Sequence, residues 1–383
     1  MEERKGFGSN FGFLMASVGS AVGLGNIWGF PNKMGASGGF TFLVVYLVLA
    51  VLCGFIVMVG ELALGRKTGK GVVSAYHVLS KRFKWLGWLG ILSPFFILFF
   101  YCALGGYCIK YVVVNVGDLF GASFGSAAFA EVAAANGTSL GAEVFNAFMG
   151  NPTEAIIYGL IFVALTMLIV MDTLVALMAC LCVIPGRFAL DPSGTLGGPK
   201  LLFVTMQNVF SRMGGLGPIF GILFYLLVVF AAISSSISLL EAVVAHFVDK
   251  ARDSGKGDKR KKYTLIAAVA VGVGAILICA DSLGGADFTP WKFLGLPEAD
   301  IRTWNDCWLD FFDMLSEGIM MPLGALLMSI MIGWELGPDV VKEECEQSGH
   351  PMSGYGFFKV CIKFITPLCM ILVLYGQIKE FFF

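Results

Sequence analysis

Charged residues are scarce in this sequence. Only 14% of its 383 residues are Asp, Glu, Lys or Arg, and 57% are hydrophobic, against about 25% and 45–50% in an average soluble domain. A soluble protein this apolar could not cover its surface with polar side chains. Its 26 Lys and Arg nearly balance its 27 Asp and Glu, so no excess of positive charge indicates a nucleic-acid partner. The composition therefore predicts a polytopic membrane protein with the lipid bilayer as its solvent.

Catalytic and metal-binding motifs are also missing from the sequence. The three histidines, His77, His246 and His350, are scattered along the chain, and no nucleophile–base pair accompanies them. The ten cysteines lie mostly inside apolar runs without metal-ligand spacing. We interpret them as small hydrophobic side chains and not as disulfides or zinc ligands. The sequence therefore predicts no enzyme.

Long apolar runs account for most of the chain. A transmembrane helix needs about 20 mostly apolar residues, because the hydrocarbon core is roughly 30 Å thick. No linker or low-complexity stretch separates the runs, so we predict a single membrane domain over residues 1–383. The runs are Phe11–Pro31, Gly39–Gly65, Trp85–Gly117, Ala155–Ile184, Leu216–Phe247, Tyr263–Ala280, Leu309–Trp334 and Phe357–Leu374.

Loop charges predict the orientation. Arg66–Lys84 carries six basic residues and no acidic ones, and Lys250–Lys262 carries seven basic residues. Asp118–Glu154 has four acids and no base, and Asp281–Asp306 has five acids and two bases. Because positive loops stay in the cytoplasm, we expect a multi-pass protein of the cell membrane with a cytoplasmic N-terminus.

This orientation conflicts with the number of runs. The two basic loops require an even number of crossings between them, but three runs lie there. The middle run, Ala155–Ile184, has 30 residues with Asp172 near its centre, and as one helix it would be about 45 Å long. Two helices, near 155–171 and 172–190, would need a turn at Met171–Asp172, where no Gly or Pro provides one. The charge pattern favours two short crossings or a missing segment.

The most informative stretch is Gly19–Pro31, GSAVGLGNIWGFP. Its mid-span glycines each cost about 1 kcal/mol relative to Ala in a helix, so the segment can unwind, and unwound backbone at membrane depth lines a cavity or binds an ion. Freed N–H groups near Gly23 and Gly25 would suit a carboxylate. The alternative is a small-residue packing face. Unwinding would also free oxygen atoms, which are hard ligands of the kind that Na⁺ prefers. They are the main-chain carbonyl oxygens of Gly19, Ala21 and Val22 and the side-chain amide oxygen of Asn26.

These motifs resemble the sodium-coupled neurotransmitter and amino-acid symporter family, which includes the bacterial leucine transporter. GLGNIWGFP is followed by SGGFTFLVVY and GELALGR, as in the first two spans of that family. The resemblance implies an all-α, incomplete leucine-transporter-type inverted-repeat helix bundle of about 8–9 transmembrane helices. It implies sodium-coupled symport of an amino acid or related small amine by alternating access. Further segments similar to the third, seventh, eighth and tenth spans are Ser93–Tyr101, Asp172–Pro185, Leu201–Asp249 and Leu309–Trp334.

The family resemblance implies two sodium sites. Hydroxyl groups in the apolar run around Ser234 need hydrogen-bond partners, and the alternative to ion binding is a bond to a carbonyl one turn earlier. A carboxylate inside a membrane span, such as Asp172, usually has a functional role. The alternative is that Asp172 lies in an accidental turn at the junction with Met171. The second site takes carbonyls from Gly19, Val22 and Ala231 and hydroxyls from Ser234 and Ser235. The first takes Ala21, Asn26 and Asp172.

The resemblance also implies a substrate site. The Tyr101 hydroxyl would bind an amino-acid carboxylate, which would also meet Gly25 and Ala21. Ser20 and Leu239 would line the side-chain pocket. The alternative for Tyr101 is a core aromatic residue with a satisfied hydroxyl.

Four further residues match gating or bracing positions of the family. Arg4 and Asp249 would close the cytoplasmic side, although both are also compatible with ordinary interfacial charges. Glu61 matches a buried glutamate that braces the unwound segments. Asp313 matches the acid of the external gate, whose usual Arg is Gly29 here.

The chain departs from the family between its fourth and seventh spans. Met171 is followed directly by Asp172, and nothing resembles the fifth or sixth span. In the family the sixth span supplies substrate contacts and part of the first sodium site, so both of these sites are incomplete here. We therefore expect impaired transport. The alternative is a non-transporting, internally deleted chain that only inserts into the membrane or associates with itself or another chain.

The sequence also bears on chloride use and on pore formation. Ala176 lies near the position where chloride-using relatives have a serine, which favours chloride independence together with Asp172. A sodium leak channel is a further alternative, but no ring of pore charges indicates one. The sequence does not indicate which amino acid is the substrate: small, branched and aromatic side chains are all compatible with it.

Overall fold

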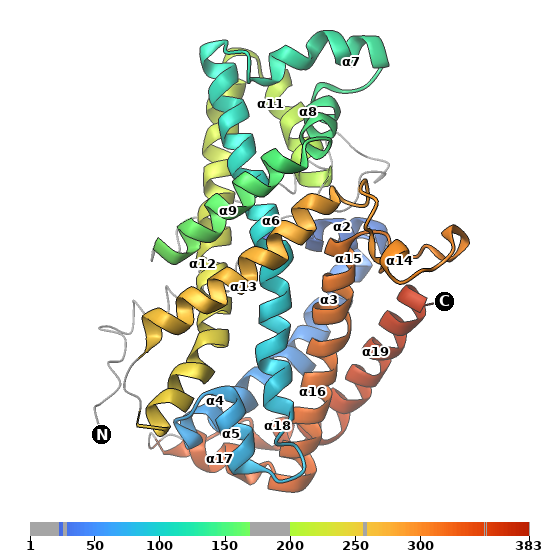
Figure 1. Cartoon of the computed structure of the whole chain (residues 1–383). Coiled ribbons are helices and arrows are strands. Elements are labelled where there is room, and N and C mark those ends of the chain that lie inside the picture. The colour runs from blue at the N-terminus through green and yellow to red at the C-terminus, as the bar shows by residue number, and fades with distance from the viewer. Residues whose placement is uncertain are drawn as a thin grey trace. The chain divides into compact units, whose positions relative to one another are not determined.

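The chain is described by a computed structural model over residues 23–25, 29–168, 200–255, 259–347, 349 and 351–382. Within these residues every regular element is a helix (Figure 1), which confirms the all-α prediction. In chain order the α-helices are α2 (Phe30–Ala36), α3 (Phe40–Leu49), α4 (Ile56–Thr68), α5 (Val72–Leu79), α6 (Leu86–Phe120), α7 (Ala130–Asn136), α8 (Leu140–Met149), α9 (Pro152–Leu168), α11 (Met206–Arg212), α12 (Gly217–Asp253), α13 (Arg260–Asp281), α14 (Pro290–Phe293), α15 (Trp308–Asp313), α16 (Met321–Ile330), α17 (Asp339–Glu346), α18 (Tyr355–Val360) and α19 (Thr366–Phe382).

Several short helices join into longer ones through wider π-helical turns. Ala50–Phe55 joins α3 to α4, Met314–Met320 joins α15 to α16, and Cys361–Ile365 joins α18 to α19. Six helical segments of the described chain are then long and apolar enough to cross a membrane. They are Phe40–Thr68, Leu86–Phe120, Gly214–Asp253, Arg260–Asp281, Trp308–Leu336 and Tyr355–Phe382.

Helices α8 and α9 are long and apolar enough to cross a membrane only as a pair, and the chain bends by 88° between them. If this bent pair is one span, the described chain has seven crossings. Of the predicted first span, only residues 23–25 and 29–31 are among those described, and the predicted span at 172–190 lies outside them. The total of eight or nine crossings stays a prediction.

The helix Phe40–Thr68 shows how these segments meet lipid. Its apolar side chains are largely exposed, Val45, Leu47 and Val51 among them. Such a surface is stable in hydrocarbon and not in water. The helix ends at Gly69, which adopts the left-handed conformation (φ 59°) and donates its N–H to the Gly65 carbonyl, an ending that favours glycine.

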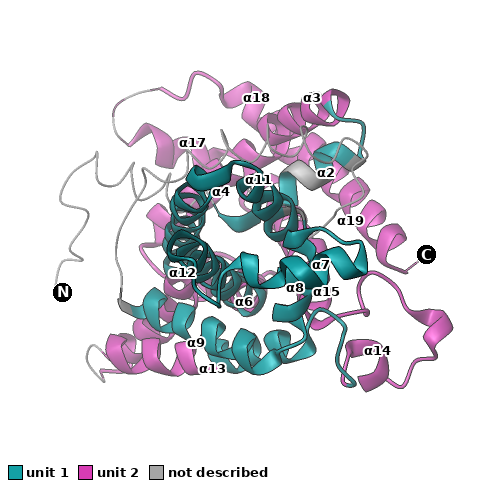
Figure 2. Cartoon of the chain, turned by 90° about the horizontal axis from the view of Figure 1, so that it is seen from above, with its two compact units in different colours: residues 1–39, 99–238, 271–287 teal, residues 40–98, 239–270, 288–383 magenta. Residues whose placement is uncertain are grey.

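The described chain divides into two compact units (Figure 2). Unit 1 comprises Met1–Gly39, Phe99–Ser238 and Val271–Asp287, and unit 2 comprises Phe40–Leu98, Leu239–Ala270 and Phe288–Phe383. Helices α6, α12 and α13 each contribute residues to both units. The single membrane domain predicted from the sequence stays a prediction.

Unit 1 is built around an aromatic core. The Tyr111 ring lies 5.0 Å from that of Phe203 and 5.1 Å from that of Tyr225, between ring centroids. Tyr111 and Tyr225 are fully buried. Beside this core α6 approaches α9 so closely that a Cβ on Gly106 would lie 2.5 Å from the main-chain nitrogen of Gly159. Small residues allow this contact between helix backbones.

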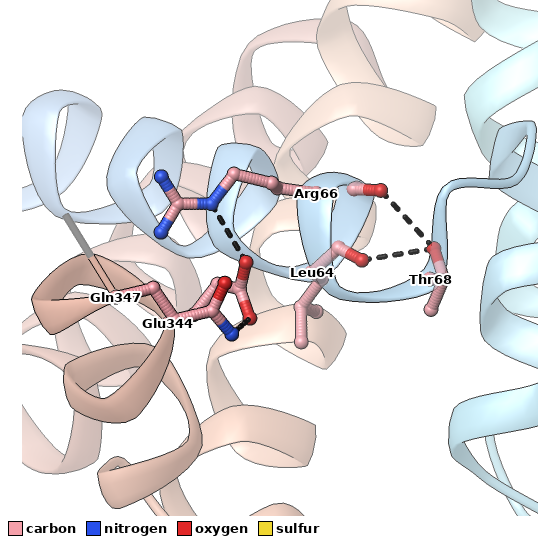
Figure 3. A network of polar contacts seen from close by, with 6 residues as sticks. Leu64, Arg66, Thr68, Glu344 and Gln347 are labelled. Atoms are coloured by element: carbon pink, nitrogen blue, oxygen red, sulfur yellow. Dashed lines mark hydrogen bonds and ion pairs between the residues drawn. The ribbon is translucent and has the colours of Figure 1, made fainter. Parts of the chain in front are cut away.

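Unit 2 combines an apolar core with a buried ion pair (Figure 3). The Arg66 Nε group donates to Glu344 Oε1 at 2.6 Å, and Gln347 Nε2 donates to the other carboxylate oxygen at 2.9 Å. The Glu344 side chain is only 3% exposed. The pair ties the end of α4 to α17, next to buried Leu64 and Val341 of the core.

Candidate functional site

The described part of the first span begins at Gly23, inside the stretch where the sequence predicts a break. Gly23 has no helical geometry, and a helix begins at Leu24. N–H groups in the first turn of a helix have no partner within that helix. The Leu24 N–H instead donates to the Tyr101 hydroxyl at 2.7 Å, and both side chains are buried. The structure thus brings Leu24, at this helix start, and the predicted substrate-binding Tyr101 together in unit 1.

Gly23 is required at this point by close packing. A Cβ on Gly23 would overlap the Tyr101 hydroxyl oxygen and would lie 3.3 Å from Ser235 Oγ. Residues of α6 and α12 therefore meet at the break. Of the predicted serines, Ser235 is the one nearest to it, and its side chain is buried.

The neighbouring serines of α12 bond to their own helix. Ser234 Oγ donates to the Ala231 carbonyl at 3.0 Å, and Ser236 Oγ donates to the Ala232 carbonyl at 2.8 Å. Such bonds satisfy hydroxyls in an apolar helix. Ser234 and Ala231 are both predicted sodium ligands, so the structure places two of these oxygens side by side. A hydroxyl that donates its proton keeps lone pairs for an ion.

Much of the predicted site lies outside the described residues. The second sodium site is described only in its α12 half, and no residue of the first is described. Gly25 is exposed, and a Cβ there would meet nothing within 4 Å. The residues of the predicted sites and gates that lie outside the description are Arg4, Gly19, Ser20, Ala21, Val22, Asn26 and Asp172.

The remaining predicted residues belong to unit 2. Asp249 accepts a hydrogen bond from the Gly71 N–H at 2.9 Å, which ties α12 to the turn between α4 and α5. No sequence pattern indicates this contact directly, apart from the glycines at 69 and 71. Glu61 and Leu239 line a cavity of about 340 Å³. Asp313 ends α15 and is partly buried.

Comparison with known proteins agrees with this geometry. The family model of the sodium:neurotransmitter symporter family matches residues 4–120. YhdH of Bacillus subtilis, an uncharacterized sodium-dependent transporter, is 27% identical over 95% of this chain and 96% of its own length. The chain is similar to the sodium:neurotransmitter symporter family in residues 4–120 and to a sodium-dependent transporter over nearly its whole length.

Two further known proteins are similar to this chain. It has the fold of MhsT, solved in complex with L-phenylalanine, with a TM-score of 0.78, 22% identity and coverage of 98% of this chain and 100% of that one. The human sodium-dependent neutral amino acid transporter SLC6A17 is 33% identical over 29% of this chain, which spans 15% of that protein. The similarity to sodium-dependent transporters and the six apolar helical segments of the described chain support a multi-pass membrane protein.

Proposed function

We propose that this chain is built for sodium-coupled symport of an amino acid or related small amine by alternating access. The observation that carries the proposal is the meeting of three parts of unit 1. The Leu24 N–H bonds to Tyr101, and Gly23 lies against both Tyr101 and Ser235. A helix break, a phenol and a hydroxyl cluster at one point supply the donor and acceptor groups that a sodium-coupled carboxylate site needs.

The proposed second sodium site has carbonyls of Gly19, Val22 and Ala231 and hydroxyls of Ser234 and Ser235. Gly23, which follows Val22 in the chain, lies against Ser235, and the Ala231 and Ser234 oxygens are 3.0 Å apart. This spacing suits two oxygens that share one cation. The proposed first site, with Ala21, Asn26 and Asp172, is supported by the sequence alone.

The proposed substrate is an amino acid whose carboxylate binds Tyr101. A phenol that accepts from an N–H still has its own proton to donate to a carboxylate, and N–H groups at Ala21 and Gly25 would add to the site. Ser20 and Leu239 are proposed to line the side-chain pocket. MhsT was solved with L-phenylalanine, and SLC6A17 is named for neutral amino acids, which supports this class of substrate.

The proposed gates use groups at both ends of the path. Arg4 and Asp249 close the cytoplasmic side, where Asp249 is also fixed by the Gly71 N–H. Asp313 is the acid of an external gate that has Gly29 in place of its arginine. Glu61 braces the broken segments, and transport does not require chloride.

We further propose that transport by this chain is impaired. Its alignment with YhdH runs over 457 positions, whereas this chain has only 383 residues. YhdH therefore carries residues that have no counterpart here. A gap at Met171–Asp172 would remove the fifth and sixth spans and with them half of the substrate site. The same observation favours the second candidate, a non-transporting chain that inserts or self-associates.

Uptake and binding measured on the purified chain in liposomes test the proposal. We expect sodium-dependent binding of a radiolabelled neutral amino acid such as L-phenylalanine, with uptake close to that of empty liposomes under an inward sodium gradient. A Tyr101→Phe variant should bind less amino acid, because it removes the proposed carboxylate contact together with the acceptor of the Leu24 N–H, and its folding is measured alongside. Strong sodium-dependent uptake would contradict impairment. Binding that does not respond to sodium would contradict the symport site, and detergent sizing would then test for constant self-association.

A further inference from the structure

Unit 2 contains a cavity that shares Glu61 and Leu239 with the proposed function and is otherwise not used by it. Its volume is about 340 Å³, and α4, α5, α6, α12 and the Met314–Met320 turn with α16 contribute its walls. Pockets for small organic molecules in proteins begin at roughly this size. Most of the lining is apolar, including Val72, Leu89, Pro94, Ile97, Leu239 and Met320.

Three polar side chains line the same cavity. Tyr76 and Ser93 contribute hydroxyls and are otherwise buried, while the Glu61 side chain is exposed at the cavity wall. Ser93 Oγ donates only a long hydrogen bond, 3.4 Å, to the Ser316 carbonyl. Glu61 is the only charged residue among those that line the cavity in the described chain.

No described residue makes a hydrogen bond or ion pair with Glu61. The nearest arginine along α4, Arg66, is engaged by Glu344 on another helix. A carboxylate in an apolar setting within a spanning helix is unfavourable by several kcal/mol unless it gains a partner or a proton. The cavity therefore offers one negative charge, two hydroxyl acceptors and apolar walls.

We propose that this cavity binds an organic ammonium ion with a small apolar body. The ammonium group pairs with Glu61 and donates to the hydroxyls of Tyr76 and Ser93, since an ammonium has three protons to donate. The apolar body packs against Pro94 and Met320. The proposed substrate site differs in Gly25 and Tyr101, which belong to unit 1, whereas Leu239 and the bracing residue Glu61 are named in both proposals. The inference does not depend on sodium or on transport.

Binding of radiolabelled 2-phenylethylamine to the full chain in lipid nanodiscs tests the proposal. The measurement is made in sodium-free potassium buffer, with 2-phenylethanol as the uncharged competitor of the same shape. We expect saturable amine binding that weakens about tenfold or more in Glu61→Gln, the usual effect of losing a charge-assisted hydrogen bond. The alcohol should compete about tenfold more weakly than the amine, for the same reason.

Three variants locate the site. Gly324→Leu should abolish binding, because a Cβ on this cavity-lining glycine meets nothing within 4 Å and the longer side chain can fill the space. Glu343→Gln removes the same charge from an exposed position of unit 2 and should leave binding unchanged. Tyr101→Phe should also leave it unchanged, which separates this result from failure of the transport proposal.

Several results would overturn the inference. These are absence of saturable binding, equal affinity for the alcohol, wild-type affinity in Glu61→Gln or Gly324→Leu, and loss of binding in Tyr101→Phe. If Glu61→Gln does not fold, the binding measured in Gly324→Leu and the competition by 2-phenylethanol still test whether the cavity binds the ammonium ion.

Discussion

The Tyr101 hydroxyl accepts a hydrogen bond from the main-chain N–H of Leu24 at 2.7 Å. The two residues are 77 positions apart in sequence, and both are buried in unit 1. A buried N–H without a partner is unfavourable in an apolar interior. Tyr101 therefore stabilises the helix start at Leu24.

Replacing Tyr101 with Phe should weaken both folding and binding. The variant leaves the Leu24 N–H unpaired, so we expect the free energy of unfolding to fall by about 1–3 kcal/mol. Sodium-dependent amino-acid binding should fall as well, because the carboxylate contact is lost. Chemical unfolding in detergent and radioligand binding measure the two effects.

Tyr111→Phe is the matched control for this variant. Tyr111 lies on the same helix and is fully buried, but its hydroxyl has no hydrogen-bond partner in the structure's described part. Removing it should leave the free energy of unfolding unchanged or slightly raised. Equal losses in both variants would show that the Leu24 contact has no special role.

Gly23→Ala tests the close packing at the break. The added Cβ would overlap the Tyr101 hydroxyl and crowd Ser235, and overpacking of this kind destabilises proteins by about 1–3 kcal/mol. We expect a lower unfolding midpoint and weaker sodium binding. Gly25→Ala is the control, because its Cβ meets no atom within 4 Å. Tolerance of Gly23→Ala would contradict the described packing.

The sequence predicts candidate site residues, but not the contacts that hold the described ones in place. Mid-span glycines predict a break, and the motifs around Tyr101 and Ser234–Ser236 predict which helices face it. The bond from Leu24 to Tyr101 depends on how two distant helices pack, which no local pattern contains. Asp249 is similar, because the sequence pairs it with Arg4 whereas the described chain shows the main-chain N–H of Gly71 bound to it.

Helix boundaries were predictable to different degrees. Long apolar runs such as Leu309–Trp334 mark helices because a spanning segment must be apolar along most of its length. The 10-residue helix α8 lies inside the predicted acidic loop, since a short helix packed on the protein needs only one apolar face. Its 88° bend to α9 follows from packing and from Pro152, which starts α9.

The ion pair between Arg66 and Glu344 should stabilise unit 2. In Arg66→Gln the nearly buried Glu344 carboxylate loses the Arg66 contact of the network in Figure 3 and keeps the hydrogen bond from Gln347. Because Arg66 itself is half exposed, we expect a moderate loss of about 1–3 kcal/mol in the free energy of unfolding. Thermal unfolding of the purified protein measures it.

Lys67→Gln provides the comparison for Arg66→Gln. Lys67 is the next residue on α4 and is exposed, so its replacement should change the free energy of unfolding by no more than about 0.5 kcal/mol. A similar loss in both variants would mean that general positive charge, and not the contact with Glu344, stabilises this end of α4.

The central claim is that the break in the first span and the serines of α12 hold a sodium ion. The most direct test is the unfolding midpoint of the chain in NaCl and in KCl at equal ionic strength, because an ion that binds only the folded state raises it. We predict a higher midpoint in sodium, and a sodium affinity about tenfold or more lower in Ser234→Ala and Ser235→Ala. Ser236→Ala should match the wild type, since that hydroxyl is fully buried and donates to the Ala232 carbonyl. Equal midpoints in the two salts, or equal losses in all three serine variants, would contradict the account.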